Sequence, residues 1–290
     1  MATVLRSYIF ITFIVCCISF AILVTSVSTT SWVNARLLSN AGNEEDIVNY
    51  GLFIGTLKKI AFATPSYYTI HMACIPKDNV CAWSCKKSAE EREEEIQNLY
   101  TTANASFGCI EKDSKGIRNV ARSPWDIPKP SITNLMSPTV RGSVDKTFIN
   151  LGIWASTLTS LILAIVLAGV AALGAVVNIA ANPVRTIAAI PGLYIWNGLA
   201  AFFAILTMVL WGGHFAASLV DSIALRETIT GECHVDTARV GFSYWLILAS
   251  ALLHLANIGI LLFRRVMLLR IPEPPKVTPA EDTDGTLFLY

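Results

Sequence analysis

Two long apolar runs joined by a short turn constrain this chain more than any other feature. Between Lys146 and Asp221, the only Asp, Glu, Lys or Arg is Arg185. The runs on either side of it, 148–179 and 191–213, are both long enough to cross a hydrocarbon core, which takes about 20 helical residues. A buried hairpin in a soluble core would seldom go uncharged for so long. The sequence therefore predicts a transmembrane helical hairpin.

Two further apolar runs, 9–29 and 242–263, complete the set of predicted spans. A chain that is 53% hydrophobic and 15% charged suits an integral membrane protein better than a soluble domain. The run 9–29 could instead be a cleaved signal peptide, but its apolar stretch exceeds the usual 7 to 15 residues, which favours a retained helix. We predict an all-α membrane fold: a four-transmembrane-helix bundle with a large extracellular first loop that contains short β-strands.

Short basic segments determine the expected topology. Lys and Arg near the ends of spans stay in the cytoplasm, so Arg6, Arg185 and the cluster 264–276 share one side. Both termini are then cytosolic. The predicted order is N-terminus 1–8, first span 9–29, extracellular loop 30–147, second span 148–179, cytosolic turn 180–190, third span 191–213, second extracellular loop 214–241, fourth span 242–263 and tail 264–290.

The first loop has the composition of a folded polar domain. Turn glycines around an aromatic pair at 49–55, and β-forming residues at 66–72, indicate short strands. The segment 88–100, with five glutamates, is typical of an exposed helix. Because a calcium site needs ligands spaced around a turn, we interpret this acidic run as a solvated face.

Five cysteines fall on the expected oxidising side of the membrane, where thiols form disulfides. They are Cys74, Cys81, Cys85, Cys109 and Cys233. The four in the first loop allow three connectivities, among which sequence cannot choose. Cys233 is then free or joins the two loops. A zinc site from Cys81, Cys85 and a histidine is a weaker hypothesis because the spacing is not that of a zinc knuckle.

Asn104 begins an Asn-Ala-Ser sequon on the same side, and we predict that it carries a glycan. Inside the bilayer, Asn197, His254 and Asn257 are costly unless they are paired. Asn197 and Asn257 are expected at one depth, so we predict a structural hydrogen bond rather than a transport site. None of the spans contains an acidic residue, and a cation pathway therefore lacks its usual carboxylate.

Other classes of function find no support in the sequence. There is no GxSxG elbow or HExxH motif, so we expect no enzyme, no catalytic or metal site and no cofactor. There is also no basic stripe suited to nucleic acid. The expected partners are the lipid bilayer, membrane proteins through the extracellular loop, and a PDZ-type scaffold.

The scaffold prediction rests on the end of the tail, where Phe288, Leu289 and Tyr290 follow a polar spacer rich in proline and acidic residues. A free carboxylate with alternate apolar side chains suits strand addition to a PDZ groove. The alternative is that this terminus folds back on the membrane surface, where aromatic residues are common.

Several segments together resemble the clarin family, four-span proteins of the wider claudin-like tetraspan group. They are YGLFIG at 50–55, NPVR at 182–185, PGLYIWN at 191–197, His214, SYWLILAS at 243–250, HLAN at 254–257 and LFLY at 287–290. The resemblance implies a plasma-membrane protein of sensory cells, concerned with hearing and linked to hair-bundle and synapse organisation through actin and scaffold partners. Clarins have a shorter first loop with cysteines just after the GLF motif, so their disulfide pairing does not transfer to this chain.

Two classes of function follow from the resemblance. The first is an organiser whose outer loop contacts membrane partners and whose tail recruits scaffolds. The second is an auxiliary channel subunit or a claudin-like junction component. Claudins carry a Trp-Gly-Leu-Trp pattern before two cysteines; Trp32, Gly51 and Leu52 match it, but Phe53 replaces the second tryptophan. This difference favours the organiser.

Overall fold

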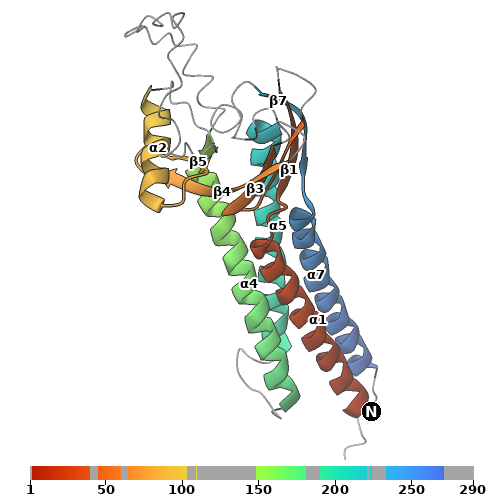
Figure 1. Cartoon of the computed structure of the whole chain (residues 1–290). Helices are drawn as coiled ribbons and strands as arrows, with labels where there is room; N and C mark the ends of the chain where they lie inside the picture. Colours follow the sequence, from red (N-terminus) through yellow and green to blue (C-terminus); the bar gives the residue numbers. More distant parts are fainter. Residues whose placement is uncertain are drawn as a thin grey trace, which may run out of the picture.

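Four long apolar helices form a bundle in the computed structural model (Figure 1). The structure describes residues 2–39, 45–59, 65–102, 109, 148–180, 190–220, 223 and 233–270. The helices are α1 (Ala2–Ser28), α4 (Leu151–Ala180), α5 (Ile190–His214, extended by the π-helix η1, Phe215–Leu219) and α7 (Phe242–Leu269). Both α1 and α5 lie against α4 and α7, which closes the bundle. By length and hydropathy each can cross a membrane, and the predicted four-helix fold is confirmed.

An antiparallel sheet of seven strands lies at one end of the bundle (Figure 1). The strands are β1 (Val33–Ser39), β2 (Glu45–Tyr50), β3 (Ile54–Lys59), β4 (Ser66–Ile75), β5 (Val80–Ser84), β6 (Ile149–Asn150) and β7 (Cys233–Val240). Their order is β6-β5-β4-β3-β2-β1-β7. The predicted strands of the first loop are confirmed. The sheet is larger than the sequence indicated, because β7 comes from the segment between α5 and α7 and pairs with β1.

One face of the sheet packs on the helix ends. Along β1, Val33, Ala35 and Leu37 are buried while Arg36 is exposed, the alternation of a strand with one face on a core. At the junction, the rings of Trp32 and Trp211 meet edge to face with centroids 5.6 Å apart. One continuous hydrophobic cluster includes residues of the sheet and of the helices. The sheet is therefore built into the bundle rather than tethered to it.

The acidic helix α2 (Ala89–Thr102) packs on β4 and β5. Its buried side chains, Ile96 and Leu99, join a small cluster with Phe148, while four of its five glutamates are exposed. The fifth, Glu95, is half-buried and accepts a hydrogen bond from the Ser84 hydroxyl. Burial raises the pKa of Glu95 above its ordinary value, in opposition to that hydrogen bond.

Two disulfides hold this part of the sheet domain together. Cys74 and Cys81 lie directly opposite each other on β4 and β5 and are bonded. Cys85, just after β5, is bonded to Cys109, beyond α2. The structure thus has one of the three connectivities that the sequence left open. Both cysteines of the weaker zinc hypothesis are used in these bonds. Cys233 pairs in register with Ser39 as the first residue of β7, and its side chain lies outside the described part of the chain.

Candidate functional site within the helix bundle

Small and polar side chains form the buried seams between the four helices. On α1 the buried residues include Thr12, Cys16, Ser19, Leu23 and Ser26, and on α7 they include Ser243, Ile247, Ser250, His254, Asn257 and Leu261. This spacing of three and four residues is that of helices packed nearly parallel, and small side chains let the backbones approach. The hydroxyl oxygens of Ser19 and Ser250 are 2.6 Å apart, and those of Ser160 and Thr207 are 2.8 Å apart.

A cluster of four fully buried polar side chains lies within these seams, and we call it the polar cluster. It consists of Cys16 on α1, Asn197 on α5, and His254 and Asn257 on α7. Asn197 Oδ1 lies 2.9 Å from His254 Nδ1 and 3.2 Å from Asn257 Nδ2. It also accepts from the Cys16 thiol at 3.5 Å, and Asn257 Nδ2 donates to Cys16 Sγ at 3.1 Å. The structure thus brings together all three polar residues singled out in the spans.

The hydrogen bonds of Asn197 fix the tautomer of His254. Asn197 Nδ2 donates to the carbonyl of Leu193 at 2.8 Å, which leaves Oδ1 directed at the cluster as an acceptor only. His254 Nδ1 must then carry the proton, and Nε2 of the neutral ring is an acceptor. Neither His254 Nε2 nor Asn257 Oδ1 has a hydrogen-bond partner within the described residues. Two buried acceptors of the polar cluster therefore receive no hydrogen bond from the described residues.

The chemistry of the polar cluster is that of a structural junction between helices. It joins α1, α5 and α7 through one amide oxygen, and in hydrocarbon each unpaired polar group would be costly. The four helices contain no Asp or Glu in their described residues, so no carboxylate lies among the groups that the cluster could relay a proton to. We interpret the cluster as a set of hydrogen bonds that fixes the register of α1, α5 and α7 relative to one another.

Cys16 is the member of the cluster that sequence reasoning missed. A free cysteine in an apolar helix usually acts as a small core residue, so its type alone does not indicate a polar role. A signal was present in the spacing: Thr12, Cys16 and Ser19 recur at intervals of four and three residues, which places them on one helix face. That face is the one buried against α7, as the hydrogen bonds of Ser19 and Cys16 show.

The remaining predicted site residues lie outside the described residues. They are the sequon residue Asn104 and the terminal residues Phe288, Leu289 and Tyr290. Their glycosylation and scaffold binding stay predictions.

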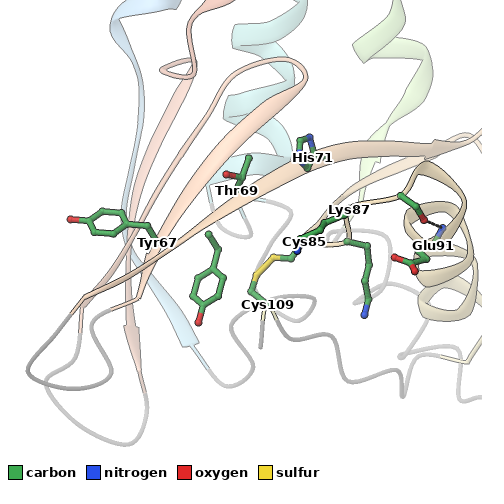
Figure 2. A pocket seen from close by; sticks show the side chains of 10 residues that line it. Tyr67, Thr69, His71, Cys85, Lys87, Glu91 and Cys109 are labelled. Carbon is green, nitrogen blue, oxygen red and sulfur yellow. Dashed lines mark hydrogen bonds between the residues drawn. A yellow bond between two sulfur atoms is a disulfide. The ribbon is translucent and has the colours of Figure 1, made fainter. Parts of the chain in front are cut away.

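A second candidate site is an open hollow of about 760 Å³ beside β4 of the sheet. Figure 2 shows Tyr67, Thr69 and His71 along β4, with Lys87 and Glu91 on the opposite side and the Cys85–Cys109 disulfide between them. Burial, together with the Arg92 guanidinium, lowers the pKa of His71. Aromatic rings with charges of both signs suit contact with another protein better than a small-molecule pocket.

Comparison with known proteins shows which sequences this chain is similar to. No family model matches the chain. Human Clarin-3 is 31% identical over 117 residues, which are 38% of this chain and 50% of the relative. Rat Clarin-3 is 40% identical over 77 residues, or 24% of this chain and 32% of the relative. Mouse Clarin-3 is 30% identical over 118 residues, again 38% and 50%. The matches span half or less of the length of these relatives.

The four apolar helices and their buried polar seams define a multi-pass membrane protein with disulfide bonds in its sheet domain. The similarity to Clarin-3 from three mammals supports a relationship between this chain and the clarin family. The resemblance inferred from the sequence motifs is confirmed.

Proposed function

We propose that this protein is a non-enzymatic, clarin-like organiser of the plasma membrane in sensory cells, which connects extracellular partners to actin-linked structures or synapses. The observation that carries the proposal is the sequence similarity to Clarin-3. The hearing-related role follows from the family resemblance alone.

The architecture supports an organiser on physical grounds. The sheet shares one hydrophobic core with the helix bundle, so a partner bound to the sheet would contact a domain that packs directly on the helices. The hollow on the ectodomain offers Tyr67, Lys87 and Glu91 to such a partner. A tail that binds a scaffold would complete the connection across the membrane.

A claudin-like junction component or auxiliary channel subunit is the second candidate function. Trp32, Gly51 and Leu52 match the claudin pattern, and Trp32 is buried at the junction between sheet and bundle. Phe53, in place of the second claudin tryptophan, is 41% exposed and packs edge to face on Trp154.

Localisation of a tagged copy in polarised epithelial cells separates the two functions. An organiser is expected over the free surface and its actin-rich protrusions. Enrichment at cell–cell contacts, with a rise in transepithelial resistance relative to untransfected cells, would favour the junction component and overturn the organiser.

Glycosylation of Asn104 tests the proposed topology, in which both termini are cytosolic and the sheet is extracellular. Digestion with an N-glycosidase is expected to increase the gel mobility of the wild-type protein made in a secretory cell, and Asn104→Gln should remove that shift. Asn98→Gln is a matched control because Asn98, on α2, lies outside any sequon. An unshifted wild-type band would contradict either the modification or the orientation.

Scaffold binding by the tail tests the cytosolic half of the proposal. A glycine appended after Tyr290 moves the terminal carboxylate while it preserves hydrophobicity, so capture of a PDZ scaffold by the tail should be lost. Membrane association is expected to remain. If the extended tail binds the scaffold as well as the wild-type tail does, the carboxylate is not recognised and the strand-addition hypothesis is wrong.

A further inference from the structure

Basic and amide side chains line a hollow on the outer face of the sheet, where β7 leads into α7. The hollow measures about 460 Å³, and we call it the headgroup site. Its polar residues include Asn34 and Arg36 on β1, Asn49 on β2 and Arg239 on β7. Asn34 lies directly opposite both Asn49 and Arg239 in the sheet, so these side chains share one face. Arg36 stands on that same face, two residues along β1.

The headgroup site has an excess of positive charge and of hydrogen-bonding capacity. No Asp or Glu occurs among the residues that line it. Within the described part of the chain, neither Arg36 nor Arg239 has an ion-pair partner, and both are exposed. Asn34 Oδ1 is buried and has no hydrogen-bond partner there. A ligand that suits these groups carries a negative charge and also a donor for the amide oxygen.

The length of α7 places the headgroup site at the membrane surface. Phe242 and Arg264 are 22 residues apart in one helix, which corresponds to about 33 Å, close to the thickness of a hydrocarbon core. With the guanidinium of Arg264 among headgroups at one side, Phe242 lies at the opposite boundary. Arg239 is three residues before Phe242 in extended chain, within about 10 Å of that boundary and so at headgroup depth.

Exposed aromatic residues continue from the headgroup site toward the bilayer. Phe242, which lines the hollow, is 55% exposed, and Trp245, one helical turn further along α7, is 53% exposed. A soluble anion would make no hydrophobic contact with this apolar surface. A molecule with an anionic head and apolar chains would fit both parts.

We propose that the headgroup site binds an anionic phospholipid from the leaflet on the side of the sheet. Arg36 and Arg239 hold its phosphate, since guanidinium groups bind phosphate oxygens through paired hydrogen bonds. Asn34 Oδ1 accepts from the amine or hydroxyl of the headgroup. The acyl chains lie against Phe242 and Trp245. Lipid bound here would fasten the β7 edge of the sheet to the membrane surface.

Native mass spectrometry of the purified full chain tests the proposal. The protein is released from micelles that contain phosphatidylserine and phosphatidylcholine in equal amounts, and the retained lipids are counted. Wild-type protein is expected to retain a phosphatidylserine that the double variant Arg36→Gln, Arg239→Gln binds about tenfold or more weakly, because two charged hydrogen-bonding groups are lost. The matched control is Lys86→Gln with Lys87→Gln, which removes the same charge from exposed positions outside the headgroup site.

Each outcome of this experiment decides the proposal. Equal retention by the wild-type protein and the arginine variant would overturn it, as would equal losses in the arginine and lysine variants. Glycerophosphoserine binding as tightly as the whole lipid would show a site for free anions, and displacement by heparin fragments at lower concentration than by lipid would show a site for sulfated glycans. If the glutamine variant fails to fold, Arg36→Lys with Arg239→Lys replaces it: a loss of phosphatidylserine supports the proposal, and unchanged binding overturns it.

Discussion

Replacing Asn197 by leucine is expected to lower the free energy of unfolding by about 2–3 kcal/mol, because one amide oxygen serves three donors on two other helices. Leucine has nearly the shape of asparagine, so the change removes hydrogen bonds more than volume. His254 Nδ1 and Asn257 Nδ2 then lose a shared acceptor in hydrocarbon. Asn257→Leu should cost less, because it removes two donated bonds and also an acceptor that has no partner among the described residues.

A double-mutant cycle measures the coupling within the polar cluster. Unfolding by SDS titration in mixed micelles gives the free energy for each single variant and for Asn197→Leu with Asn257→Leu. The double variant should cost about 1 kcal/mol less than the sum of the single variants, since each single change already leaves a partner unsatisfied. Thr159→Val is the control: Thr159 is exposed on α4 and donates only within its own helix, to Ala155 O. Strict additivity would contradict the observed contacts.

The four helices and the polar cluster differ in how far local sequence could predict them. Hydropathy predicted every span because the bilayer acts on each helix separately. The pairing of Asn197 with Asn257 could be predicted from their depths alone, because an unpaired amide in hydrocarbon is rare and costly. The role of Cys16 could not be predicted in this way. A thiol is also stable among apolar neighbours, and its contacts depend on which face of α1 meets α7.

The sheet could be predicted only where its pairing is local. Strands β2 to β4 follow one another along the chain, and turn residues and β-forming side chains mark them. In the sequence, the helices α2, α4 and α5 lie between β1 and β7. These two strands can pair only when the helix bundle has formed and has brought them together. The disulfide between Cys74 and Cys81 depends on the register of β4 with β5, which spacing alone does not give.

The junction between β7 and α7 provides the second prediction, at Gly241. A Cβ atom at this position would lie 2.0 Å from the carbonyl oxygen of Ser31 and 2.6 Å from its carbonyl carbon. That oxygen also accepts from the amide of Ser243 at 3.2 Å, and the Gly241 amide donates to Trp32 O at 2.9 Å. The backbone φ of Gly241 is −85°, so conformational freedom is not what the glycine supplies. Glycine is needed at this position because a side chain would not fit between the two backbones.

Gly241→Ala is therefore expected to lower the free energy of unfolding by about 3 kcal/mol, since the added methyl must push the start of β1 away from α7 and break both backbone hydrogen bonds. Gly198→Ala and Gly213→Ala are matched controls because a Cβ at either position meets nothing within 4 Å. Thermal unfolding in detergent, followed by size-exclusion chromatography, should show an early loss of the folded peak for Gly241→Ala alone. A Gly241→Ala protein as stable as the two controls would mean that Ser31 and Gly241 do not approach each other as closely as the structure has it.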